Sequence, residues 1–135
     1  MRAYCQKTGQ AIPEDEGAII RTILESLALE YKVVFDKLAK LTGNDIEVIH
    51  ILGGGSQNQL LNQMTANATG RPVVAGPIEA TVIGNVLVQA LAQEQIKSLS
   101  EGRALVARSF AGKEYRPQDS EAWQAYAQKA TGIIS

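Results

Sequence analysis

The sequence has few of the residues that mark several large classes of protein. Its single cysteine, Cys5, excludes an internal disulfide framework, and no group of Cys and His has the spacing of zinc ligands. Its apolar runs are shorter than the roughly 18 residues that cross a bilayer, and its N-terminus lacks an apolar signal segment. These features predict a cytoplasmic protein with no membrane partner and no metal site of its own.

An excess of basic charge is also lacking. The 135 residues include 13 Lys and Arg against 14 Asp and Glu, so the formal net charge is −1. Basic residues are not clustered among aromatics, so a nucleic acid is not an expected partner. The length suits one domain, residues 1–135, that buries about two-thirds of its unfolded surface.

Helical patterns fill most of the chain. Pro13 followed by three acidic residues predicts a helix start, apolar residues then recur at spacings of three and four, and Gly43 supplies the stop. This pattern predicts a helix over residues 14–41, after an irregular segment over 1–12. Further helices are expected from about 56–58 up to Gly70, over 80–93, over 100–110 with a cap at Ser100 or Glu101, and from 119 or 120 onward, with a loop over 111–119.

Only two segments have the pattern of strands, which is too few for a stable parallel sheet. Residues 46–52 form a mostly apolar run typical of a parallel strand covered on both faces, and residues 72–75 form a second, shorter one. Strands alternating with helices predict an α/β fold, but two parallel strands do not make a stable sheet alone. We therefore expect the remaining strands to come from a partner, or the open sheet edge to cause self-association.

Three consecutive glycines, Gly53, Gly54 and Gly55, lie between the first strand and the next helix. Open α/β sheets bind ligands at the carboxyl ends of their strands, where backbone N–H groups and a helix N-terminus attract anions. The spacing is neither that of a P-loop nor Gly-x-Gly-x-x-Gly, so the residues alone leave a tight packing turn and a nucleotide contact equally open. Asn58 has the same two interpretations, an ordinary helix cap or an amide that recognises a ribose or base.

Other notable residues have structural interpretations. His50 is expected to be a buried core histidine, and Glu79 a surface acid at a helix start. The remaining expectations are a close helix approach at Gly84, a local ion pair between Arg21 and Glu25, and docking of the last helix by Trp123 and Tyr126.

Three separated stretches of the sequence resemble the C-terminal region of the rhamnulokinases, a group within the FGGY carbohydrate kinases. They read YCQKTGQAIPEDEGAIIRTILESLALEY, IHILGGGSQNQLLNQMTANATGRPVVAGPIEATVIGN and PQDSEAWQAY, and the match covers nearly the whole chain. Kinases of this family have two actin-like, ribonuclease-H-like domains with sugar and ATP in the cleft between them. The resemblance implies that this chain is a partial ribonuclease-H-like domain, the latter part of the nucleotide-binding one.

The resemblance also implies a role for the glycines. In the family a Gly-Gly-Gly-x-x-Asn turn contacts the nucleotide, so Gly53, Gly54, Gly55 and Asn58 would be the ATP-binding residues, with Gly54 the strongest candidate. Ser56 and Gln57 would line the same turn. The complete enzyme would use ATP with magnesium to convert L-rhamnulose to L-rhamnulose 1-phosphate.

Several functional motifs of the family have no match in this sequence. The catalytic aspartate, the phosphate-binding turn and the sugar site of the family have no counterpart here, and Asp15, Asp36 and Asp45 do not match the catalytic motif. We therefore predict no catalytic residue and no kinase activity for the chain alone, with the missing N-terminal half as a possible partner. The alternative is a non-catalytic α/β module that self-associates, in which the glycine turn is purely structural.

Overall fold

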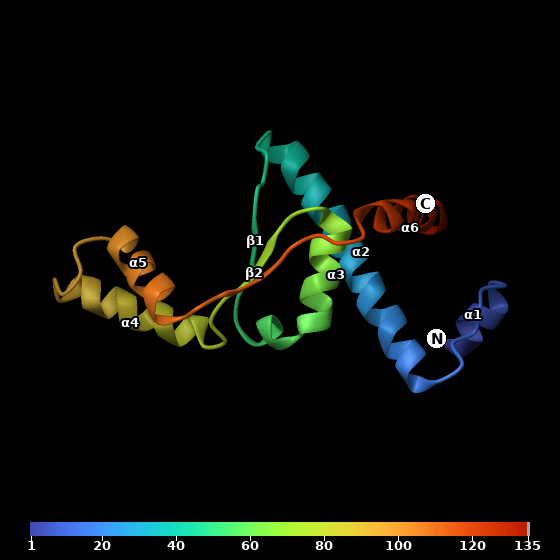
Figure 1. Cartoon of the computed structure of the whole chain (residues 1–135), viewed down its shortest axis with the longest axis horizontal. Helices are drawn as coiled ribbons and strands as arrows, with labels where there is room; N and C mark the ends of the chain where they lie inside the picture. The colour runs from blue at the N-terminus through green and yellow to red at the C-terminus, as the bar shows by residue number, and fades with distance from the viewer. Residues whose placement is uncertain (135) are drawn as a thin grey trace.

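The computed structural model describes residues 1–134 and contains short strands among several helices (Figure 1). The elements in chain order are α1 (Arg2–Lys7), α2 (Glu16–Thr42), β1 (Ile49–Ile51), the 3₁₀ turn η1 (Gly54–Gln57), α3 (Gln59–Thr69), β2 (Val73–Ala75), α4 (Ala80–Ala92), α5 (Leu99–Ser109), β3 (Lys113–Tyr115) and α6 (Ser120–Ile134). The predicted α/β class is confirmed.

The long helix α2 covers Glu16–Thr42, two residues later at its start and one residue later at its end than the predicted 14–41, and Gly43 ends it as predicted. Asp15 caps it by accepting a hydrogen bond from the Ala18 N–H at 2.7 Å, and Gly43 ends it in the left-handed conformation at φ 66°. The predicted ion pair between Arg21 and Glu25 is present at 2.8 Å. Of the whole helix only Ala28 is buried, so α2 packs along one narrow line and leaves most of its apolar face open.

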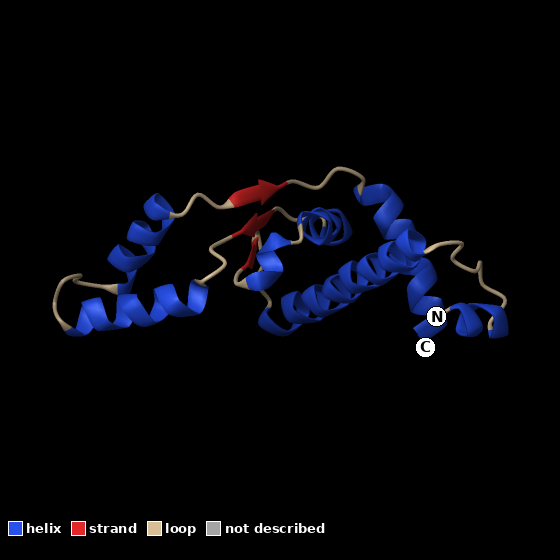
Figure 2. Cartoon of the chain, turned by 90° about the horizontal axis from the view of Figure 1, so that it is seen from below, coloured by secondary structure: helices blue, strands red, loops and turns tan. Residues whose placement is uncertain are grey.

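The sheet has three strands in the order β1-β2-β3, not two (Figure 2). β1 pairs with β2 in parallel, with Ile49 opposite Val73, and β2 pairs with β3 antiparallel, with Val73 opposite Tyr115. The prediction of a loop over residues 111–119 is therefore wrong at β3. Lys113-Glu114-Tyr115 has no apolar run to mark it, and it becomes a strand because β2 offers a free edge.

The first strand is shorter and less buried than the sequence predicted. It covers Ile49–Ile51 instead of residues 46–52, and His50 is exposed, not buried. Ile49 and Ile51 pack partly against the core, while the opposite face of the strand carries no such cover. Within the described residues, β1 is therefore an edge strand covered on one face.

Helix α3 is the centre of the core. On one side it packs with α2 and α6 through the buried cluster Ala28, Met64, Ala68 and Trp123. On the other it covers the sheet through Ala66, Val73, Ala75 and Tyr115. The prediction that Trp123 docks the last helix is confirmed, whereas Tyr126, its edge-to-face neighbour, is 60% exposed.

Helices α4 and α5 pack on each other at one end of the molecule, away from α2 and α3 (Figure 1). Ser98 caps α5, two residues before the predicted cap, and the Glu101 carboxylate accepts a hydrogen bond from the Lys97 N–H at 2.7 Å. The expected close approach at Gly84 is wrong, because a Cβ there would meet nothing within 4 Å. The close approach occurs at Gly102, where a Cβ would lie 3.2 Å from the Ile96 side chain.

The segment before α2 is not irregular throughout, because residues Arg2–Lys7 form the short helix α1, with Cys5 buried. None of the helices in residues 1–134 has the length and apolar character required to cross a membrane.

Candidate nucleotide-contact turn

Gly53 joins the ends of the two parallel strands. Its N–H donates to the Pro77 carbonyl at 3.0 Å, and the Gly76 N–H donates to the Ile51 carbonyl at 2.8 Å. The backbone at Gly53 has φ 78° and ψ −161°, a conformation that is essentially restricted to glycine. The backbone therefore requires glycine at position 53.

No such requirement applies to Gly54 and Gly55. Neither has a positive φ; a Cβ on Gly54 would meet nothing within 4 Å, and one on Gly55 would meet only the Ile51 side chain at 3.9 Å. Both residues are exposed, and their N–H groups have no hydrogen-bond partner among the described residues. Nothing within this part of the chain explains glycine at either position.

Hydrogen bonds within the turn stabilise its conformation. The Ser56 N–H and Oγ both donate to the Gly53 carbonyl, at 3.0 and 2.7 Å, so Ser56 is buried and points inward instead of lining the exposed turn. Gln57 is exposed. Asn58 caps α3 by accepting a hydrogen bond from the Leu61 N–H at 3.0 Å, which confirms its capping role.

Asn62 supports the turn, and the sequence analysis missed it. This side chain is fully buried, and its Nδ2 donates to the Ser56 carbonyl at 2.9 Å, while its Oδ1 has no hydrogen-bond partner. The only signal in the sequence was an asparagine one turn before the buried Thr65 and Ala66 on the same helix. An asparagine at such a position indicates a buried polar side chain, but it does not indicate which backbone carbonyl accepts its hydrogen bond.

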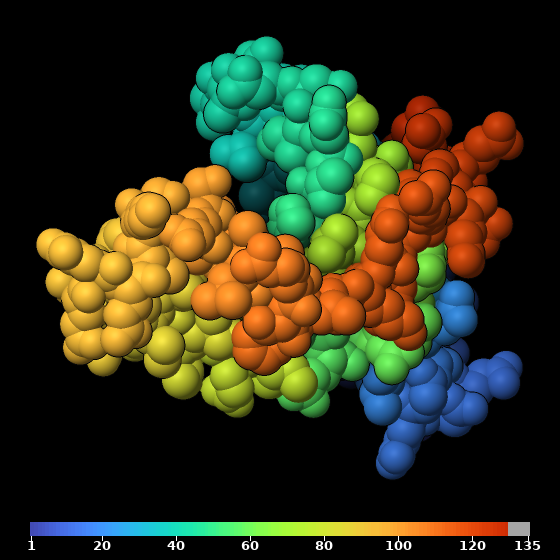
Figure 3. Space-filling model, turned by 60° about the vertical axis from the view of Figure 1, so that its left-hand side comes forward, coloured from blue at the N-terminus to red at the C-terminus, as the bar shows by residue number. Residues whose placement is uncertain are grey.

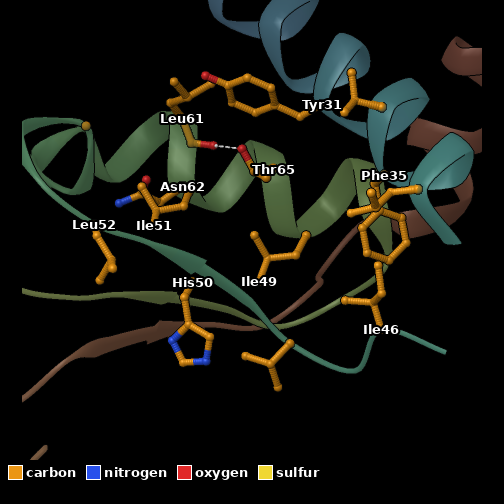
Figure 4. Close-up of a pocket in the computed structure, with 14 residues that line it drawn as sticks. Tyr31, Phe35, Ile46, Ile49, His50, Ile51, Leu52, Leu61, Asn62 and Thr65 are labelled. Carbon is orange, nitrogen blue, oxygen red and sulfur yellow. Dashed lines mark hydrogen bonds between the residues drawn. The ribbon is translucent and has the colours of Figure 1, made fainter. Parts of the chain in front are cut away.

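Two apolar hollows lie on either side of β1. The first, here called the edge groove, has a volume of about 680 Å³ and lies between α2, α3 and β1 (Figure 4). Its lining includes Tyr31, Val34, Phe35, Leu38, Ile46, Val48, Ile49, Ile51, Leu61, Asn62 and Thr65. The second, here called the face pocket, has a volume of about 810 Å³ and lies between the other face of the sheet and α4 and α5; its lining includes His50, Leu52, Val74, Ala80, Ile83, Leu87, Val106 and Phe110.

The acidic residues considered from the sequence have structural partners. Asp15 caps α2, Asp36 pairs with Lys32 at 2.9 Å, and Asp45 pairs with Arg71. Across residues 1–134, no three His, Cys, Asp or Glu side chains are grouped so that they could hold a metal ion.

Comparison with known proteins identifies the family of the chain. Residues 1–93 match the C-terminal domain of the FGGY family of carbohydrate kinases. The chain belongs to this family. The rhamnulokinase of Bacteroides thetaiotaomicron is 52% identical over 125 residues, which are 93% of this chain and 26% of that protein. The rhamnulokinase of Bacillus subtilis is 42% identical over 116 residues, and that of Enterococcus faecalis is 43% identical over 124, covering 86% and 89% of this chain and 24% and 25% of those proteins.

The match confirms the predicted resemblance of the chain to the C-terminal region of rhamnulokinases within the FGGY family. The family places the fold among the actin-like ATPases, as predicted. The chain spans about a quarter of the length of these relatives. A member of the FGGY family of this length carries only part of the kinase, which agrees with its small sheet and open apolar faces.

Proposed function

We propose that this chain forms one wall of the ATP site of a sugar kinase that phosphorylates a ketose such as L-rhamnulose. The observation that carries the proposal is the pair of exposed glycines, Gly54 and Gly55, whose N–H groups are free and whose lack of a side chain has no explanation within the described chain. A backbone that a ligand approaches closely accounts for both features. The family's use of ATP supports the same interpretation.

Four residues of the turn would hold the nucleotide. The Gly54 N–H would donate to it on the α-phosphate and ribose side, as the family resemblance implies, and Gly55 would leave room beside it. The Asn58 Oδ1 is used by the helix cap, so its Nδ2 is the group that faces the adenosine. Gly53 and Ser56 hold the turn in place, and ATP supplies the phosphoryl group that is transferred.

We propose that residues 1–135 act as one unit, the latter part of the nucleotide-binding domain of a cytoplasmic enzyme. Phosphoryl transfer requires ATP, magnesium and the acceptor hydroxyl to be positioned together with a base. The catalytic aspartate, the sugar site and the ligands of magnesium are assigned to the rest of the kinase polypeptide. The chain alone is therefore inactive and binds ATP weakly at most.

The test is an ATP titration that follows the backbone amides of residues 53–58 by NMR. A Cβ at position 54 meets no described atom within 4 Å, so Gly54→Val should add bulk in front of the turn, abolish the ATP-dependent shifts and leave the fold intact. Gly84→Val is the matched control, since a Cβ there also meets nothing within 4 Å but lies on α4. Shifts that persist in Gly54→Val would overturn the proposed contact, and a coupled assay in which the purified chain phosphorylates rhamnulose would overturn its inactivity.

The second candidate is a non-catalytic α/β module that self-associates and uses the turn only structurally. Two observations favour it, the backbone requirement for glycine at Gly53 and the capping role of Asn58. It predicts no amide shifts at residues 53–58 at any ATP concentration, together with an oligomer whose formation ATP does not affect.

A further inference from the structure

The long helix α2 has an exposed apolar face. Of its 27 residues only Ala28 is buried, and Figure 2 shows α3 and the sheet on the same side of this helix. Large apolar side chains that are between 39% and 85% exposed follow one another along it: Ile20, Ile23, Leu27, Tyr31, Val34, Leu38 and Leu41. From first to last they extend over about 32 Å, at a rise of 1.5 Å per residue. A continuous apolar surface of this length marks a site of interaction with another molecule.

The apolar residues of α2 have the repeat of a coiled coil. Steps of four and three residues alternate through the set that is here called the α2 stripe: Ile20, Leu24, Leu27, Tyr31, Val34, Leu38 and Leu41. This seven-residue repeat assigns Leu24, Tyr31 and Leu38 to the a positions and the other four members to the d positions. Leu24 is partly buried against the core, and the other six are exposed. Such a repeat predicts contact with another helix along the whole stripe.

A second helix can reach the α2 stripe without displacing α3. At about 100° per residue, Leu27 and Val34 lie roughly 100–120° around α2 from Ala28, which packs against α3. Toward the end of α2, Tyr31 and Leu38 line the edge groove, which borders the stripe (Figure 4). The space-filling view shows a hollow between the teal atoms that lead into β1 and the gold and orange atoms of α4 and α5 (Figure 3). The molecule is therefore open on this side of the end of α2.

Two charged residues beside the stripe favour an antiparallel partner helix. Glu30 and Lys37 occupy successive g positions, are exposed, and have no ion-pair partner among the described residues. In a parallel pair of identical helices, each g residue faces the e residue of the next heptad, and the two e residues concerned, Phe35 and Thr42, carry no charge. In an antiparallel pair g residues face g residues, so that Glu30 of one helix can pair with Lys37 of the other.

We propose that two copies of the chain form a dimer through an antiparallel coiled coil of their α2 helices, with the two-fold axis midway between positions 32 and 33. In this register each a residue lies opposite a d residue of the other copy, and every layer is apolar: Leu24 with Leu41, Tyr31 with Val34, and Leu38 with Leu27, each pair occurring twice. The same register places Glu30 of each copy beside Lys37 of the other.

A second copy is the partner because this face is complementary to itself. A two-fold contact uses the same surface on both copies, and here one register matches both the apolar residues and the opposite charges. The contact joins two helix faces and leaves the sheet edges unpaired. It does not depend on the proposed function, since the glycine turn lies outside α2.

Sedimentation equilibrium of the 135-residue chain tests the dimer. Leu38→Lys places a charge in two apolar layers of the coiled coil, so the dissociation constant of the dimer should rise roughly a hundredfold. Leu38 is 49% exposed within one copy, so the variant should fold normally, which circular dichroism melts establish.

Exchange of the two charges tests the antiparallel register. Glu30→Lys and Lys37→Glu each replace two attractive pairs by two repulsive ones, so each variant should form its own dimer roughly tenfold more weakly. An equimolar mixture of the two variants should dimerise as tightly as the unaltered chain, because each copy then supplies the charges that the other requires. Lys40→Glu is the matched control. It changes the net charge as Lys37→Glu does but lies on the far side of α2 from the stripe, so it should leave the dimer unchanged.

Three results would overturn the proposal. The first is a chain that stays monomeric at the concentrations used for NMR. The second is a dimer that Leu38→Lys leaves intact, which would assign self-association to another surface, such as the open edge of β1. The third is a mixture of Glu30→Lys and Lys37→Glu that dimerises no better than either variant alone. None of these measurements uses ATP, so failure of the Gly54 contact and failure of the α2 dimer are separate results.

Discussion

Replacing Gly53 by alanine separates a glycine that the backbone requires from one that it does not. At φ 78° and ψ −161°, Gly53 occupies a region that costs an L-residue about 1–3 kcal/mol. Steric contact adds little, because the new Cβ would lie 3.8 Å from the Ile78 carbonyl oxygen, an ordinary van der Waals distance. The destabilisation of Gly53→Ala should therefore be pure backbone strain, about 2 kcal/mol.

The assay is urea unfolding of the isolated chain, followed by circular dichroism. With a typical slope of about 2 kcal/mol per molar urea, a loss of about 2 kcal/mol lowers the midpoint by about 1 M. Gly54→Ala is the matched control, one residue along the same turn. Its backbone is not strained and its Cβ meets nothing, so its midpoint should stay within the equivalent of about 0.5 kcal/mol of the unaltered chain.

Equal midpoints for Gly53→Ala and Gly54→Ala would refute this reasoning, because the strand-end turn would then not hold Gly53 in its strained conformation. A large loss of stability in Gly54→Ala would also contradict this reasoning. It would mean that position 54 is glycine for reasons of packing within the chain, and the argument that an outside ligand explains it would fail.

Two further substitutions test the support of the turn and the core. Asn62→Ala removes the buried donor to the Ser56 carbonyl, so it should cost about 1–3 kcal/mol of stability and should speed hydrogen exchange across the glycine turn more than elsewhere; uniform exchange rates would show that Asn62 does not position the turn. Trp123→Ala should cost about 3–5 kcal/mol because this side chain closes the core between α2, α3 and α6, whereas the exposed Tyr126→Ala should cost less than about 1 kcal/mol; similar costs in urea unfolding would show that the last helix docks differently.

The structural features that were predicted well are those determined by residues close to one another in the sequence. Asp15, Gly43 and Gly70 mark helix ends through their own side chains or their own φ, so their effect is visible in a short window of sequence. The ion pair between Arg21 and Glu25 is equally local, since residues four apart lie on the same face of a helix.

The features predicted poorly depend on partners distant in the sequence. β3 is a strand because Val73 and Ala75 lie opposite Tyr115 and Lys113, about 40 positions along the chain, and the residues Lys-Glu-Tyr carry no pattern that announces this. His50 lies on a strand whose composition predicts burial, but β1 is at the edge of the sheet and α4 and α5 leave a pocket over this face, so the side chain is exposed. Burial of a strand face depends on how distant helices pack against it, which the strand's own residues do not determine.

The candidate site divides in the same way. The glycine triplet and Asn58 were visible as a turn between strand and helix, and the structure places them in one turn at the carboxyl end of β1. The sequence did not show which of the three glycines the backbone conformation requires. That requirement depends on the hydrogen bond from the Gly53 N–H to the Pro77 carbonyl, and these residues lie on different loops. The supporting role of Asn62 was hidden for the same reason.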